Sequence, residues 1–381
     1  MKNGMNFSKK AMGIGFPFVN LQNIFGNNVI DVSNLGKATA SDSQLKDYNL
    51  LNGDVLFVRS SVKLEGVGEA ALVPQTLDNT TYSGFIIRFR DEYGLDNNFK
   101  RFVFGIESVR NQIMSQATNS ANKNISQSVL ENLELAIPSK SEQQKIGAYF
   151  SNLDHLITLH QRKYDKLVMS KKSMLEKMFP KNGQTKPEIR FSGFIDDWEQ
   201  RKLGELGTIT TGNTPSTSIP DYYSDDGIVW VTPTDICENI TFESARKLSD
   251  LGQQVGRVVP KNTILVTCIA SIGKNTMLGN TGSFNQQING LTPNENKYDP
   301  YFLLTESALW SAKMKGSAAA GTMQIVNRTE FSELKTWLPS LIEQQAIGAF
   351  FKQLDHLITL HQRELEKLKK IKLSMLEKMF V

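Results

Sequence analysis

The sequence predicts two α/β modules, each followed by a long helix, with the two helices paired antiparallel as a coiled coil. Two observations lead to this fold class. One segment occurs twice, at 141–180 and 342–381, with about two-thirds of its aligned positions identical. The segments that precede the two copies differ in sequence but follow the same order of turns and β-rich runs. Duplication of this kind predicts a pseudo-twofold α/β (α+β) architecture.

Each copy of the repeat has the pattern of one long helix. Ser139 with Glu142, and Ser340 with Glu343, have the spacing of a capping box directly after a proline. Core positions then recur at alternating steps of four and three, which is the heptad pattern of a coiled coil. In the first copy the predicted seam consists of Ile146, Phe150, Leu153, Ile157, His160, Tyr164, Leu167, Lys171, Met174 and Met178. In the second copy it consists of Ile347, Phe351, Leu354, Ile358, His361, Leu365, Leu368, Lys372, Met375 and Met379.

The two copies are expected to pair with each other. Antiparallel pairing would place one module at each end of a rod, so that the duplication serves as a pseudo-twofold spacer. All four histidines lie in these helices, at 155, 160, 356 and 361. Five residues correspond to roughly 140° of helix rotation, which disfavours a metal site. The favoured interpretation is a buried polar layer at His160 and His361 that sets the helix register.

The two modules share a skeleton. GFPFVNLQNI at 15–24 parallels GIVWVTPTDI at 227–236, and each has the pattern of a turn with a β-rich run. A helix is expected to start at LDNNF, residues 95–99, and at YDPYF, residues 298–302. Each module then closes with a predicted strand that leads into the long helix. These closing strands are LELAIP at 133–138 and LKTWLP at 334–339.

Composition and charge limit the class of protein. The net charge of +4 over 381 residues permits nucleic acid as a partner without requiring it. Cys237 and Cys268 match no disulfide or metal-ligand spacing and suit a reducing cytosol. The N-terminus leads into no apolar signal region, and no apolar run has membrane-spanning length. We therefore expect a soluble, cytoplasmic protein without a membrane partner.

The sequence contains no recognisable catalytic motif. It has no P-loop pattern and no Asn-Pro-Pro or Asp-Pro-Pro tetrapeptide ending in an aromatic residue, the mark of amino-methyltransferases. Neither module contains a histidine to act as a general base, and no zinc spacing occurs. We expect no catalytic residue, no metal and no cofactor in this chain.

Three stretches carry a resemblance to a known family. They are LPSLIEQQAIGAFFKQLDHLITLHQR at 338–363, KMFPK at 177–181 and RFSGFIDDWEQRKLGEL at 190–206. Together with the two-copy layout, they resemble the DNA-specificity subunit of type I restriction-modification systems, over almost the whole chain. The resemblance implies target-recognition domains at 1–140 and 196–341, spacer helices at 141–180 and 342–381, and a linker at 181–195.

The resemblance also implies the partners. Each target-recognition domain would read one half of a bipartite site in double-stranded DNA. The helices would space the two domains and dock two adenine-N6 methyltransferase subunits, and through them the restriction and translocase subunits. The subunit itself would not be an enzyme. S-adenosylmethionine, ATP and Mg²⁺ would belong to the partner subunits.

DNA-contacting residues are expected among the basic and amide side chains of predicted loops, because phosphates attract Lys and Arg, and amides read adenine. In the first module the candidates are Arg59, Lys63, Asn119, Asn122 and Lys123. In the second they are Lys274, Gln286, Gln287, Lys315, Thr322 and Gln324. The alternative for each is an ordinary solvated loop residue.

The surface for protein partners is expected on the outer stripe of the helices. Its members are Leu156, Leu159, Leu357 and Leu360. The alternative is extra contact between these leucines and the chain's own modules. The aromatic residues Phe18 and Trp230 lie in apolar runs and are predicted to belong to the core.

The first module departs from the family pattern. It begins at about the position of Gly212 and is expected to lack a counterpart of Trp198–Thr211. One alternative function is therefore a decayed specificity subunit whose shortened first module does not bind DNA. Two others are a scaffold that holds two protein partners without DNA, and an enzyme with an unrecognised site. A steep salt dependence of DNA affinity separates the recognition subunit from the scaffold.

Overall fold

The computed structural model describes residues 1–181, 183–269, 272–319 and 325–380. The chain forms two compact units. Unit 1 contains Met1–Arg162 and Gln362–Val381, and unit 2 contains Lys163–His361. No helix within the described ranges is long and apolar enough to cross a membrane.

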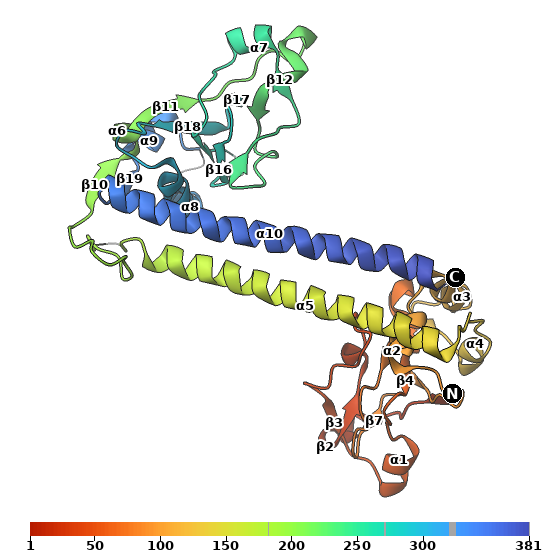
Figure 1. Cartoon of the computed structure of the whole chain (residues 1–381). Helices are drawn as coiled ribbons and strands as arrows, with labels where there is room; N and C mark the ends of the chain where they lie inside the picture. The colour runs from red at the N-terminus through yellow and green to blue at the C-terminus, as the bar shows by residue number, and fades with distance from the viewer. Residues whose placement is uncertain (182, 270–271, 320–324, 381) are drawn as a thin grey trace. The chain divides into compact units, whose positions relative to one another are not determined.

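The described strands of unit 1 form three sheets, and β2, β3, β4 and β7 are labelled in Figure 1. A four-stranded antiparallel sheet has the order β1-β8-β4-β6, a three-stranded sheet has the order β3-β2-β7, and β5 pairs with β9. The strands are β1 (Lys2–Asn3), β2 (Met12–Val19), β3 (Gly36–Ala38), β4 (Val55–Val58), β5 (Ser60–Ser61), β6 (Ala70–Leu72), β7 (Thr81–Tyr82), β8 (Ile86–Phe89) and β9 (Lys123–Asn124). The helices of this module are η1 (Lys9–Ala11), η2 (Leu21–Asn23), α1 (Asp42–Asp47), η3 (Leu64–Gly66), α2 (Asn97–Val103), α3 (Glu107–Ser115) and α4 (Gln127–Glu131).

Unit 2 repeats this plan. A five-stranded sheet has the order β11-β18-β15-β16-β13, a three-stranded sheet has the order β14-β12-β17, and β10 pairs with β19. The strands are β10 (Glu199–Lys202), β11 (Gly207–Thr211), β12 (Tyr223–Val231), β13 (Ile240–Thr241), β14 (Lys247–Leu248), β15 (Ile264–Thr267), β16 (Asn275–Leu278), β17 (Gly282–Phe284), β18 (Ile288–Pro293) and β19 (Lys335–Leu338). The helices are α6 (Leu203–Leu206), η4 (Pro220–Tyr222), α7 (Asp250–Val255), α8 (Pro300–Ala319) and α9 (Arg328–Glu333).

The central strand of each module is buried on both faces, which explains its continuous apolar run. In β4, Val55 and Phe57 pack with α2 and α3, whereas Leu56 and Val58 pack with the three-stranded sheet. In unit 2, β15 divides its side chains between two cores in the same way. Phe18 and Trp230 are buried. The predicted fold class, two related mixed α/β modules with long helices, is confirmed.

The first closing strand is a wrong prediction. LKTWLP forms β19, which pairs with β10. LELAIP at 133–138 is irregular, and no strand pairs with it within the described part of the chain. The physical reason is the missing neighbour, because strand hydrogen bonds require a partner and no described residue of unit 1 forms a counterpart of β10.

The long helices pair antiparallel within each unit. Helix α5 covers Lys140–Lys177 and α10 covers Leu341–Met379. In unit 1 the beginning of α5 packs with the end of α10, through Phe150 and Phe380. In unit 2 the end of α5 packs with the beginning of α10, through Phe179 and Phe351. All seam positions are buried or half-buried. His160 and His361 are among the half-buried ones, so the expected polar layer at these histidines is wrong in its degree of burial.

The lysines that interrupt the seam are compensated by the aspartates of the LDHL motif. Lys171 Nζ lies 2.5 Å from Asp355 Oδ1 in unit 2, and Lys372 Nζ lies 2.6 Å from Asp154 Oδ1 in unit 1. All four side chains are partly shielded from solvent. The two ion pairs are equivalent under the repeat, so the identical sequence places the same polar contact in both units.

The EQQ-x-IG motif attaches each helix to its own module. Gln143 donates from Nε2 to the Pro138 carbonyl at 2.9 Å and accepts at Oε1 from the Asp96 backbone N–H at 3.0 Å. Gln344 makes the equivalent bonds with Pro339 and Asp299, at 2.9 and 3.1 Å. Because these glutamines are buried, their amides fix the start of the helix against the start of the module helix.

The glycine of the same motif permits a close approach. A Cβ added at Gly147 would lie 2.6 Å from the Phe99 backbone nitrogen, and one at Gly348 would lie 3.0 Å from the Phe302 nitrogen. These neighbouring backbone atoms cannot move away from an added Cβ as easily as the end of a flexible side chain could. The long helix therefore needs glycine where it crosses the beginning of α2 or α8.

Replacing Gly147 by valine should destabilise unit 1 by about 1–3 kcal/mol, because the crossing must open. Urea unfolding measures the loss. Gly316→Ala is the matched control, since its added Cβ meets nothing within 4 Å in α8, and it should be neutral or slightly stabilising. Equal stability of G147V and the native chain would contradict the crossing argument.

A buried acid lies in the core of unit 2. Glu306 of α8 accepts at Oε1 from the Trp337 backbone N–H at 3.1 Å, and its other oxygen is buried without a partner in the described structure. Burial raises the pKa of Glu306 to about 8. The carboxyl is therefore protonated in the folded state at neutral pH, whereas it ionises in the unfolded chain near its ordinary pKa.

Unit 2 should lose stability as pH rises from about 4.5 to about 8, because the folded state binds the Glu306 proton more tightly than the unfolded state does. Glu306→Gln should remove this slope and stabilise the protein at pH 8 by a few kcal/mol, since one pKa unit is worth about 1.4 kcal/mol. Thermal unfolding at several pH values measures it. The exposed Glu238→Gln should leave the slope unchanged, and an undiminished slope in E306Q would contradict the assignment.

Candidate nucleic-acid interface

One end of the four-stranded sheet in unit 1 gathers the predicted DNA-contacting residues. β4 ends at Val58, and β6 and β8 begin at this end, so their loops meet there. The pairing of β5 with β9 sets Ser61 opposite Lys123. The Ile125 backbone N–H donates to the Arg59 carbonyl at 3.0 Å. The loop after β4 and the polar stretch 119–124 are therefore neighbours, although about sixty residues separate them.

The candidate side chains at this end of the sheet differ in exposure and in hydrogen bonding. Arg59 is half-buried and donates from Nη1 to the Gly84 carbonyl at 3.4 Å. Lys63, Asn119 and Asn122 are exposed. Lys123 donates from Nζ to Asn119 Oδ1 at 3.3 Å. All five candidates of the first module thus belong to one surface with positive charge and amide groups.

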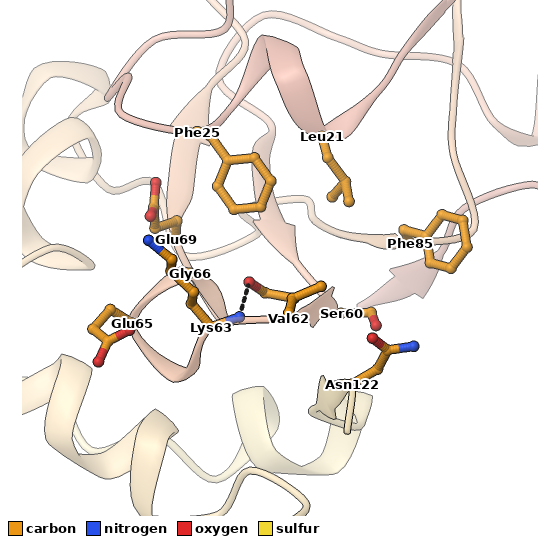
Figure 2. A pocket seen from close by; sticks show the side chains of 11 residues that line it. Leu21, Phe25, Ser60, Val62, Lys63, Glu65, Gly66, Glu69, Phe85 and Asn122 are labelled. Carbon is orange, nitrogen blue, oxygen red and sulfur yellow. Dashed lines mark hydrogen bonds between the residues drawn. The ribbon is translucent and has the colours of Figure 1, made fainter. Parts of the chain in front are cut away.

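An apolar hollow of about 490 Å³ adjoins these polar groups (Figure 2). Its lining includes Lys63 and Asn122 together with the exposed side chains of Phe25, Val62 and Phe85. Val62 is 76% exposed and Phe85 58% exposed. The prediction, which considered basic and amide residues, did not include these apolar side chains. RSSVK at 59–63 indicates one of them, because it places the apolar Val62 among polar residues. Apolar groups beside polar ones suit base edges, which include the thymine methyl group.

The described candidates of unit 2 lie at the equivalent end of its sheet. Lys274 precedes β16, is exposed, and donates from Nζ to the Pro233 carbonyl at 3.1 Å. Lys315 of α8 is exposed and adjoins Gly273 in the loop before β16. Thr322 and Gln324 lie outside the described residues.

Two glutamines occupy the turn before β18. Gln286 is exposed and accepts at Oε1 from the Thr214 hydroxyl. Gln287 is half-buried, and its side chain accepts from Asn285 Nδ2 at 3.1 Å, whereas its carbonyl accepts from the Cys268 N–H at 2.8 Å. The β-ladders make Gln287 the counterpart of Phe85, since each precedes the strand paired with the central strand. Equivalent positions thus carry different chemistry in the two units.

The described residues do not form an evident catalytic set. No group of three or more His, Cys, Asp or Glu side chains could hold a metal ion within the ranges described. Burial raises the pKa of the Cys268 thiol to about 11, so it stays protonated and is a poor nucleophile at neutral pH. The arrangement can bind through charge, amides and apolar contact.

The outer stripe of the long helices is accessible. Leu156 and Leu159 in unit 1, and Leu357 and Leu360 in unit 2, are each between 37 and 45% exposed. The near-equality of the two pairs follows from the repeat. The alternative prediction, contact with the chain's own modules, has no support from these exposures, although partner binding itself remains a prediction.

The described chain thus has two related modules, each with polar loops at the equivalent end of its sheet and each packed on the duplicated helices. A family model for the type I restriction modification DNA specificity domain matches residues 2–169 and 195–370. The chain therefore belongs to the type I restriction-modification DNA specificity family. Members of this family are specificity subunits, which are not themselves catalytic.

Individual relatives agree with the family. The putative type I restriction enzyme MjaX specificity subunit of Methanocaldococcus jannaschii is 23% identical, over 98% of this chain and 88% of its own. The EcoKI specificity subunit of Escherichia coli is 27% identical over 38% of this chain and 32% of its own. The type I S subunit from M. genitalium shares the fold, with a TM-score of 0.65 at 15% identity, covering 100% of this chain and 93% of that chain.

Proposed function

We propose that this chain reads a bipartite site in double-stranded DNA for a type I restriction-modification complex. The first target-recognition domain is assigned to 1–140 and the second to 196–341. Residues 141–180 and 342–381 are the spacer helices, and 181–195 is the linker. The observation that carries the proposal is that both units expose polar loops at the same end of the same sheet, with different side chains.

The candidate side chains of these loops fall into those that suit phosphates and those that suit bases. Lys63, Lys274 and Lys315 supply flexible positive charges that suit phosphates. Asn122 and Gln286 supply amides that suit adenine, and Arg59 suits guanine. The candidates for base contacts are Arg59 and Asn122 in unit 1 and Gln286 in unit 2. Because they differ between the units, each unit would select its own half-site.

The helices would dock the catalytic partners. Each unit has one pair of exposed leucines on the outer stripe, and the two pairs have the same spacing. One methyltransferase subunit would therefore bind each pair. Restriction and translocase subunits would join through those methyltransferases. S-adenosylmethionine, ATP and Mg²⁺ would be bound by these partners, in the bacterial cytoplasm.

DNA binding by the complex with its cognate methyltransferase should weaken steeply as salt rises. Arg59→Ala or Lys274→Ala should cost about 1–3 kcal/mol if the side chain reads a base, or lower the salt slope by about one if it contacts phosphate. Fluorescence anisotropy on duplex DNA measures both. Lys46→Ala and Lys297→Ala are controls, because these exposed lysines lie outside the loops at the reading end of the two sheets. A flat salt response in the assembled complex would favour the scaffold alternative.

Replacing Leu357 and Leu360 by serine should remove one of the two methyltransferase subunits, and replacing Leu156 and Leu159 as well should remove both. Loss of apolar burial at the contact is the reason. Sizing with light scattering counts the subunits. Leu373→Ser, at a more exposed position on α10, is the control and should leave the count unchanged. Retention of both subunits by the fourfold variant would place docking elsewhere.

A further inference from the structure

Unit 1 carries a face that is covered in unit 2. Under the repeat, Ile137 corresponds to Leu338, and Phe380 corresponds to Phe179. Leu338 is 5% exposed, whereas Ile137 is 45% exposed. Phe179 is buried, whereas Phe380 is only half-buried. The strand ladders add a further pair of equivalent residues. Leu291 of β18 is buried, whereas its counterpart Phe89 of β8 is half-buried.

The cover in unit 2 is the segment Trp198–Thr208. Trp198 packs on Phe179 with ring centroids 5.8 Å apart. β10 then pairs with β19, placing Glu199 opposite Leu338. Leu203 and Leu206 of α6 are fully buried in the core of unit 2. This segment therefore supplies a strand, an aromatic side chain and two leucines to one face.

The described residues of unit 1 include a counterpart only for the last residues of the equivalent segment. β1 pairs Lys2 with Arg88 and Asn3 with Ile87, as β11 pairs Thr210 and Thr211 with the corresponding residues of β18. The expectation that the whole of Trp198–Thr211 lacks a counterpart is thus wrong for its last three residues, because Met1 lies at the position of Ile209 and packs on the core of unit 1. The uncovered face corresponds to Trp198–Thr208.

The backbone of 133–138 is already oriented for a partner strand. Gln112 donates to the Glu134 carbonyl at 3.0 Å and accepts from the Glu134 N–H at 2.9 Å. Lys313 similarly donates to the Lys335 carbonyl in unit 2. The neighbouring Leu135 makes no backbone hydrogen bond within the described chain, whereas Thr336 lies opposite Arg201 of β10. An unpaired edge beside the exposed Ile137 and the half-buried Phe89 and Phe380 can accept an added strand.

We propose that this face of unit 1, made by 133–138, Phe89 and Phe380, binds a polypeptide segment with the chemistry of Trp198–Thr208. The occupant is a short strand preceded by an aromatic residue and followed by a helical turn with two leucines. In the β10 register, the position of Lys202 would lie opposite Glu134, where unit 2 has Lys335. An occupant with a basic residue there gains a favourable cross-strand pair. The inference rests on the two units and is independent of the DNA-reading proposal.

A synthetic peptide with the sequence of 195–211, added to the full chain, tests the inference by hydrogen exchange. Exchange at 133–137 should slow at least tenfold at saturation. The same peptide with Trp198, Leu203 and Leu206 replaced by serine should not protect. In the chain, Ile137→Lys should abolish protection, whereas Val32→Lys, at a site 41% exposed in the same unit, should preserve it.

A tethered variant makes a negative result decisive. Fusing the sequence of 195–209 directly before Lys2 continues the β1 register and raises the local concentration of the segment. Exchange at 133–137 should then slow without added peptide. Unaltered exchange in the fusion protein, or equal protection by the serine peptide, would overturn the proposal.

Discussion

The close crossing between each long helix and its module is the contact on which the remaining structure depends. Gly147 and Gly348 let the helix backbone approach the first turn of α2 or α8, and the buried amides of Gln143 and Gln344 bond across that crossing. Since the residues that attach each α/β module to the long helices are the same in both copies of the repeat, the module surfaces can diverge while their attachment stays constant. The repeat therefore preserves geometry, and the modules carry the differences.

That separation accounts for the chemistry at the sheet ends. Loops at the end of a packed sheet can change without disturbing the core, because the strands beneath them stay paired. Unit 1 offers Arg59, Lys63 and an apolar hollow, whereas unit 2 offers Lys274 and a glutamine pair. A protein that recognises one asymmetric target in two halves needs this combination of constant frame and variable surface.

The sequence predicted much of the frame because the repeat compares the chain with itself. The helices, their antiparallel pairing, the module order and the polar character of the candidate loops were all accessible from pattern, whereas the meeting of those loops at one sheet end required the strand pairing. Two features were not. The failure of 133–138 to form a strand depends on a neighbour that pattern within 133–138 cannot reveal, and the hollow at Phe25, Val62 and Phe85 depends on side chains that pattern assigns to cores. The ion pairs of Lys171 and Lys372 also required the antiparallel register to be known.

Two different modules on a common frame would read two different half-sites. The most direct test is the methylome of cells that co-express this chain with its cognate methyltransferase subunit, obtained by single-molecule sequencing. The account predicts one split motif with N6-methyladenine on both strands and unlike halves. Methylation that follows only one half-site, or none in cells where the complex is verified to assemble, would contradict it.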